Sequence, residues 1–158
     1  MSKRSEKAKE LFLNGYNCSQ AVFGVFCEEY GLDFNTAMKL SSSFGGGMGR
    51  MREVCGTVSG MFMAAGLIYG FSDTSDKNAK GELYKKIQEL ATRFKEKNGS
   101  IICRELLSGI ESSTSPIPSE RTETYYKKRP CVELVAEAVE IFEEFLNQTE
   151  IDENISQV

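Results

Sequence analysis

Residues 54–71 read VCGTVSGMFMAAGLIYGF, a run of eighteen residues without a charged side chain. A run of this length is sufficient to span a membrane as a helix. Its four glycines, together with Thr57 and Ser59, make it only mildly hydrophobic. Helices that are apolar on all sides occur both in membranes and in protein cores. We therefore predict a buried central helix, and not a membrane span.

Small residues recur along one face of this helix. Gly56, Gly60 and Ala64 are spaced four residues apart, which places them on the same side of a helix. Without bulky side chains on that side, a neighbouring backbone can approach closely. The pattern predicts tight packing inside a helical bundle. The apolar helix is also compatible with a homodimer, although burial within one chain explains it equally well.

Helical periodicity continues on both sides of the central run, and no segment alternates with the period of two that indicates a half-buried strand. Asn17 and Gln20 form a capping box for one of these helices. The predicted helices on the two sides of the central run cover residues 3–13, 18–30, 34–42, 75–98, 101–108 and 130–147. The sequence therefore predicts an all-α fold, a single compact helical bundle around a buried, glycine-containing central helix.

The chain of 158 residues is long enough to bury a sizeable core as one domain. Residues 1–14 are expected to form the N-terminal helix of this domain. Residues 111–129 are polar and contain the sequence STSPIP at 113–118, which predicts a mobile connection. Residues 148–158 are predicted to be a disordered tail.

The chain contains five cysteines and no histidine. Without imidazole there is no Ser-His-Asp or Cys-His catalytic triad, no HExxH zinc site and no histidine-ligated haem. None of the remaining side chains has an unperturbed pKa near neutrality. Any proton or electron chemistry is therefore expected to use carboxylates, lysines, tyrosines or the thiols.

The charges exclude other classes of function. A net charge of −4 with both signs mixed along the chain argues against a nucleic-acid-binding protein, which usually has a basic face. The charged residues 1–10 lead directly into Leu11 without the apolar core of a secretory signal. We expect a cytoplasmic location, where thiols serve redox chemistry, metal binding or packing more often than structural disulfides.

Four of the five cysteines fall at predicted helix starts that have basic neighbours: Cys18, Cys55, Cys103 and Cys131. The N-terminus of a helix has a positive potential that stabilises a thiolate. Thiols in such positions can have pKa values lowered from about 8.5 to roughly 3.5–7.5. Cys27 instead lies inside a helix beside Phe23 and Phe26, and we predict that it is a packing residue.

The glycine-rich segment 44–50, FGGGMGR, precedes the second of these cysteines. It lacks the GKS or GKT ending of a phosphate-binding loop and follows no predicted strand. We predict a tight turn that brings Arg50 and Cys55 toward a shared site.

The spacing of the cysteines does not identify their partners. Four cysteines allow three disulfide connectivities. The absence of a CxxC motif disfavours a thioredoxin-type site, and the spacings do not match common ferredoxin or zinc-ribbon patterns. A four-thiolate site assembled from distant helices remains open.

Several segments resemble one known family. The sequence CGTVSG at 55–60 is similar to the CGAxxG motif of a family of small redox-active proteins with four characteristic cysteines, and a related domain occurs in split-Soret cytochrome c. The resemblance includes NCSQAV at 17–22, FGGGMGR at 44–50, CRELL at 103–107 and the segment after Cys131. It covers roughly residues 16–146. Thr57 stands where the motif has alanine.

The resemblance implies an α-helical redox protein in which Cys18, Cys55, Cys103 and Cys131 are functional. Our first hypothesis is a redox protein that uses cysteine thiolates for thiol–disulfide exchange or electron transfer. As a thiol–disulfide oxidoreductase it would act on a redox partner protein, whose disulfide Cys55 or Cys18 would attack. Arg50 and Arg52 would stabilise the attacking thiolate. Gly56 and Gly60 would support the site by close packing.

Two alternatives use the same cysteines. The four thiolates could bind zinc or an iron–sulfur cluster, since tetrahedral sulfur ligation suits both. The chain could also be a helical interaction module in which the cysteines are buried structural residues. The sequence alone assigns no cofactor.

Overall fold

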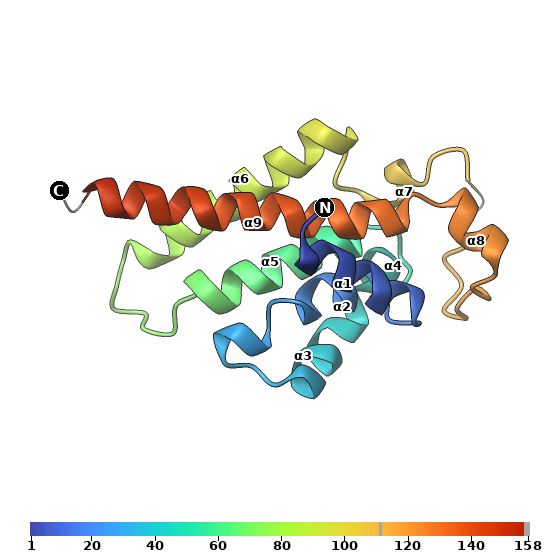
Figure 1. The fold of residues 1–158 in the computed structure, drawn as a ribbon, viewed down its shortest axis with the longest axis horizontal. Helices are drawn as coiled ribbons and strands as arrows, with labels where there is room; N and C mark the ends of the chain where they lie inside the picture. Colours follow the sequence, from blue (N-terminus) through green and yellow to red (C-terminus); the bar gives the residue numbers. More distant parts are fainter. Residues whose placement is uncertain (111, 157–158) are drawn as a thin grey trace.

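Helix α5 (Gly56–Tyr69) occupies the middle of the computed structural model, which describes residues 1–110 and 112–156 (Figure 1). Its residues 56–61 are all buried, as are Ala64 and Ala65. The prediction of a buried, glycine-containing central helix is therefore confirmed. None of the helices in the described part of the chain is long and apolar enough to cross a membrane.

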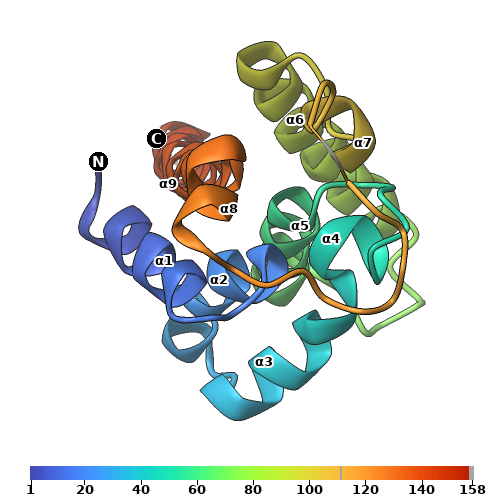
Figure 2. The same ribbon diagram turned by 90° about the vertical axis from the view of Figure 1, so that its right-hand side faces the viewer.

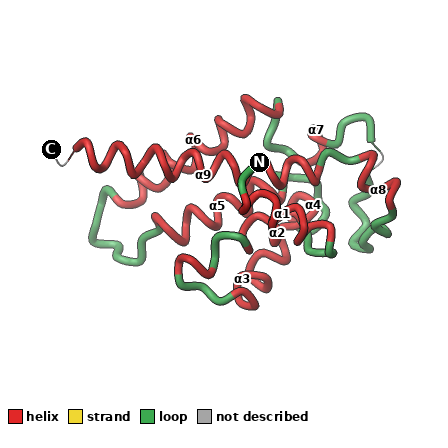
Figure 3. Tube along the Cα trace, viewed as in Figure 1, coloured by secondary structure: helices red, strands yellow, loops and turns green. Residues whose placement is uncertain are grey.

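The described residues form an all-α fold without a strand (Figure 3). Before α5 come α1 (Lys3–Leu13), α2 (Cys18–Gly24), η1 (Glu28–Tyr30), α3 (Phe34–Ser41), η2 (Ser42–Phe44) and α4 (Gly45–Met48). After it come α6 (Ala79–Asn98), α7 (Cys103–Leu106), α8 (Glu123–Lys128) and α9 (Cys131–Ser156). Viewed along α9, the bundle has α1 on one side of this long helix and α5 and α6 on the other (Figure 2).

Aromatic side chains fill the centre of the bundle. Phe26, Phe94 and Phe142 come from three separate segments and are fully buried. The rings of Phe26 and Phe142 meet edge to face with centroids 5.0 Å apart, a favoured geometry for an aromatic pair. The buried side of α9 also carries Val135 and Ala138. This core fixes α9 against the N-terminal half of the chain.

Helices α2 and α5 approach so closely that a side chain could not fit between them. A Cβ atom on Gly60 would lie 2.7 Å from the carbonyl oxygen of Ser19 and 3.0 Å from Cβ of Val22. A Cβ atom on Gly56 would lie 2.4 Å from Sγ of Cys18. The predicted small-residue face is thus the contact between α5 and α2.

The structure shortens three of the predicted helices. In the segment 18–30, the α-helix ends at Gly24. Tighter turns follow, in which a backbone N–H donates to the carbonyl three residues earlier, as Phe26 N does to Phe23 O at 3.1 Å. Helix α6 begins at Ala79 and not at residue 75, because the Asp76 carboxylate accepts hydrogen bonds from backbone N–H groups at the turn. The segment 101–108 is helical only over α7.

The predicted connection at 111–129 contains a helix that the polar composition concealed. Thr122 caps α8 by accepting a hydrogen bond from Tyr125 N at 3.2 Å. Lys127 pairs with Glu123 one turn away, and Tyr126 packs edge to face on Phe12 at 6.0 Å. Residue 111 lies outside the described residues.

Helix α9 extends beyond its predicted end near Asn147 and is continuous to Ser156. The prediction of a disordered tail is therefore wrong for residues 148–156, and residues 157–158 lie outside the described part of the chain. Hydrogen bonds one turn apart support this polar extension. Gln148 donates to Asp152 at 2.9 Å, and Ser156 donates to the Asp152 carbonyl at 2.8 Å.

Replacement of Gly60 by alanine should destabilise the protein by about 1–3 kcal/mol, because the added methyl group meets backbone atoms of α2. Gly66 lies on the same helix, and a Cβ there would meet nothing within 4 Å. Gly66→Ala is the matched control and should stabilise the protein by about 0.5–1 kcal/mol through helix propensity. Urea unfolding of the two variants measures both changes. Equal effects of the two substitutions would contradict the close contact.

Candidate functional site

All four of the predicted site cysteines line one small cavity, whose volume is about 60 Å³. Each lies at the start of a different helix. Cys18 is the first residue of α2, Cys55 is the N-cap of α5, and Cys103 and Cys131 are the first residues of α7 and α9. The starts of α7 and α9 lie toward the end of the molecule that carries α8, on the right in Figure 1. Segments separated by more than a hundred residues thus meet at these thiols.

The fifth cysteine is separate from this cavity. Cys27 is fully buried in the hydrophobic core, and its thiol donates to the carbonyl of Gly24 at 3.4 Å. Cys18 and Cys131 are half-buried, whereas Cys55 and Cys103 are 6% and 7% exposed. The structure therefore divides the thiols into four at the cavity and one in the core.

An unusual turn connects the first two thiol segments. Residues 46–50 all have positive φ, with values of 58–68°, so α4 is not a right-handed helix. Two backbone hydrogen bonds close the turn. Arg52 N donates to Gly46 O at 3.2 Å, and Glu53 N donates to Gly47 O at 3.0 Å. A Cβ on Gly47 would lie 2.6 Å from Cβ of Cys103. The glycines therefore provide both the backbone conformation and the space beside the cavity.

Backbone hydrogen bonds hold the segment before α5 against the segment before α7. Cys55 N donates to Ile101 O at 2.8 Å, and Cys103 N donates to Glu53 O at 2.6 Å. Val54 and Ile102 form an isolated antiparallel bridge between these bonds. Cys55 and Cys103 are thus positioned by the main chain and not only by side-chain packing.

Burial raises the pKa values of three of the cavity thiols, whereas the sequence predicted that they would be lowered. Desolvation raises the pKa of Cys131 to about 12 and raises the pKa values of Cys18 and Cys55 as well. The neighbouring thiols of the cavity raise all three further, since one thiolate disfavours another. The N–H groups of Gly46 and Ser19 lower the pKa of Cys18, but this effect is smaller than that of burial. The predicted lowering at helix starts is therefore wrong for these three thiols.

The two arginines predicted to support the site have different positions. Arg52 is 6% exposed, and its Nη1 lies 3.9 Å from Sγ of Cys103. Its Nε and Nη2 donate to the carbonyl of Ser113 at 3.1 and 2.9 Å. Arg50 does not line the thiol cavity but extends along an adjoining groove. Arg52 therefore contacts a thiol, whereas Arg50 lines a groove that shares several of its lining residues with the thiol cavity.

Sequence reasoning missed several residues that line the cavity. Thr57 Oγ1 lies 3.1 Å from Sγ of Cys55 and can exchange a hydrogen bond with it. Arg121, Tyr125 and Arg129 come from the segment that was predicted to be a mobile connection. Arg121 is held there by hydrogen bonds to the carbonyls of Phe12 and Tyr16, both at 2.8 Å. No periodicity in the sequence marked these side chains, because tertiary contacts position them.

The four thiols are the soft donors that zinc and iron–sulfur clusters prefer. In the part of the chain that the structure describes, however, no group of three or more histidine, cysteine, aspartate or glutamate side chains is arranged to hold a metal ion. A four-thiolate centre would therefore require the cysteine segments to move closer together.

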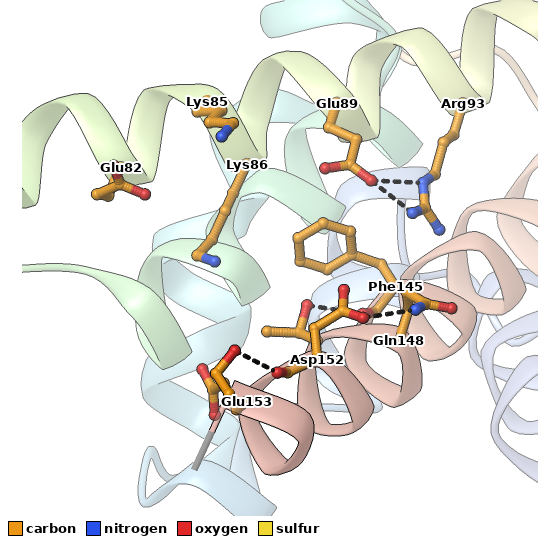
Figure 4. Close-up of a pocket in the computed structure, with 11 residues that line it drawn as sticks. Glu82, Lys85, Lys86, Glu89, Arg93, Phe145, Gln148, Asp152 and Glu153 are labelled. Carbon is orange, nitrogen blue, oxygen red and sulfur yellow. Dashed lines mark hydrogen bonds and ion pairs between the residues drawn. The ribbon is translucent and has the colours of Figure 1, made fainter. Parts of the chain in front are cut away.

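A wider groove of about 440 Å³ lies between α6 and α9 and contains no cysteine (Figure 4). Two of the basic side chains in this groove have partners. Arg93 donates from Nε to Glu89 at 3.1 Å, and Lys86 lies 4.9 Å from the centre of the Tyr69 ring. The groove offers no redox chemistry, and we place the candidate site at the thiol cavity.

A protein-family model described as "Putative redox-active protein (C_GCAxxG_C_C)" matches residues 16–145. The matched region includes all four cysteines of the cavity. Comparisons with curated proteins and with solved structures found no match.

The raised pKa values predict the pH dependence of alkylation. Because only the thiolate reacts, the rate at which iodoacetamide modifies Cys131 in the folded protein should rise about tenfold per pH unit through pH 10 without a plateau. The same peptide in the urea-unfolded chain should approach a plateau near its ordinary pKa of about 8.5. Peptide mass spectrometry measures both profiles. A plateau below pH 8 in the folded protein would show that the helix start outweighs burial.

Proposed function

The chain belongs to the C_GCAxxG_C_C family of redox-active proteins, and we propose that it exchanges electrons through thiol–disulfide chemistry in the four-cysteine cavity. One observation carries this proposal: four cysteines from four distant segments line the same small cavity, while the fifth lies in the core. Structural cysteines have no need to converge in this way, since each could be buried separately.

We assign the first step to Cys18. Cys18 is a half-buried residue, and the N–H groups of Gly46 and Ser19 lower the pKa of its thiol, although burial raises that pKa more. Cys55 is more deeply buried, and its pKa is raised well above the ordinary value. Because Cys18 is the more exposed of the two residues, a partner disulfide can reach its sulfur more readily.

We assign the resolving step to Cys55. Sγ of Cys18 lies in the space that a side chain at position 56 would fill, and position 56 directly follows Cys55. The glycine of the motif thus leaves room for the sulfur of Cys18 beside Cys55.

The two steps balance as a two-electron transfer. The Cys18 thiolate attacks one sulfur of the partner disulfide, forms a mixed disulfide and releases the other sulfur as a thiolate that takes up a proton. The Cys55 thiolate then attacks Sγ of Cys18 and releases the second half of the partner. The partner gains two electrons and two protons, and the chain retains a Cys18–Cys55 disulfide. Cys103 and Cys131 supply a second dithiol at the same cavity.

Incubation with bis(hydroxyethyl) disulfide should convert Cys18 and Cys55 into a linked pair of peptides. Cys55→Ser should stop at a stable mixed disulfide on Cys18, because the resolving thiol is absent. Cys18→Ser should reduce the exchange rate at least tenfold. Intact-mass and peptide mass spectrometry follow these products. Cys27→Ser is the matched control and should behave as the wild type.

Two other results would contradict the proposal. If all five thiols alkylate identically before and after mild oxidation, the cysteines are structural. Stoichiometric zinc or iron in protein purified anaerobically would instead assign the cavity to metal binding, and iron would add visible absorption.

A further inference from the structure

The thiol cavity adjoins a larger groove of about 390 Å³. The two concavities share Asn17, Gly46, Arg52, Arg121 and Tyr125 among their lining residues. A groove of this volume lies within the usual size range of sites for small molecules. The thiol cavity itself is much smaller, so a substrate larger than a few atoms would have to occupy the groove.

The charged residues that line this groove all have the same sign. Arg50, Arg52 and Arg121 line it, and no aspartate or glutamate is among its described lining residues. The three guanidinium groups come from the segment before α5 and the segment before α8. They surround the approach to the thiols with positive charge.

These three arginines are held by neutral oxygen atoms. Arg50 donates to Ser119 Oγ at 3.4 Å, Arg52 donates to the Ser113 carbonyl, and Arg121 donates to two backbone carbonyls. None of the three forms an ion pair with a carboxylate of the described residues. By contrast, Arg104 in the neighbouring α7 pairs with Glu53 at 2.8 Å.

Arg50 also has an unused donor. Its Nε is buried and has no hydrogen-bond partner among the described residues. A buried polar atom without a partner is unfavourable. A bound anion would supply that partner, and a guanidinium group binds a carboxylate through two parallel hydrogen bonds.

We propose that the substrate of this site is a small disulfide carrying carboxylate groups, bound in the groove by Arg50 and Arg121 with its sulfur atoms toward Cys18. The inference rests on the proposed thiol–disulfide exchange and specifies its substrate class. The exchange itself follows the two steps given above, and the reduced product is a pair of carboxylate-bearing thiols.

Three disulfides of similar size but different charge test this substrate class: dithiodipropionate as the dianion, bis(hydroxyethyl) disulfide as the neutral compound and cystamine as the dication. For each disulfide, the rate constant of the protein is divided by the rate constant of a free model thiol. This normalised rate constant should be highest for the dianion in the wild type. Its preference should weaken at high ionic strength. Stopped-flow or quenched alkylation measures the rate constants.

Arg50→Gln should lower the ratio of the dianion rate constant to the neutral rate constant about tenfold, as expected for loss of a charged hydrogen bond. Arg50→Lys should lower this ratio less than Arg50→Gln does. Lysine keeps the positive charge but lacks the planar guanidinium group that forms two parallel hydrogen bonds. Lys85→Gln removes the same charge in the groove between α6 and α9 (Figure 4) and should leave the ratio unchanged. Thermal unfolding of each variant confirms that it folds.

A ratio that is the same in Arg50→Gln and the wild type, or a preference for cystamine, would overturn the substrate class and leave the exchange function standing. Absence of exchange with all three disulfides would overturn the proposed function. Calorimetry with suberate, a dianion with the same number of chain atoms but without sulfur, then separates the two failures. Binding of suberate to the wild type but not to Arg50→Gln retains the groove as an anion site, and no binding to either removes the site as well.

Discussion

The close contact between α2 and α5 is the constraint on which the candidate site depends. At Gly60 the helices approach to a separation at which even a methyl group would meet the backbone of α2. At Gly56 the same approach leaves room only for the sulfur of Cys18. The contact therefore brings together two thiols that are far apart in the sequence. Because atoms of the main chain form much of the contact, a rotamer change in a neighbouring side chain cannot relieve a substitution there.

Two opposing effects act on the thiols, and their magnitudes decide the outcome. A helix N-terminus stabilises a negative charge by typically 0.3–1 kcal/mol. A pKa change of one unit corresponds to about 1.4 kcal/mol, and burial raises the pKa of Cys131 to about 12. Desolvation is therefore the larger effect at Cys18, Cys55 and Cys131, whose pKa values are all raised. Arg52 approaches the thiol of Cys103, and Arg129 and Arg52 lower the pKa of Cys131 without outweighing burial. Arginine side chains therefore contribute electrostatic support to this site.

Local signals in the sequence predicted much of the fold. The capping box of Asn17 and Gln20 and the apolar run of α5 depend on neighbouring residues, and both appear in the structure. The four cysteines also lie at helix starts as predicted. Their convergence on one cavity was implied only by the family resemblance, because helix positions alone do not say which ends meet. Arg121 and the direction of the pKa changes depend on tertiary burial, which no local pattern records.

The cavity is assembled from segments that begin with α2 and end with α9. During synthesis from the N-terminus, Cys18, Cys55 and Cys103 all emerge before α9 exists to cover them. Their thiols are then hydrated, and the burial that raises the pKa values of Cys18 and Cys55 in the folded protein is absent. Chemical reactivity of these thiols is consequently greatest in the nascent protein, and completion of the last helix is the event that protects them. A cellular oxidant would thus modify newly made chains more readily than mature ones.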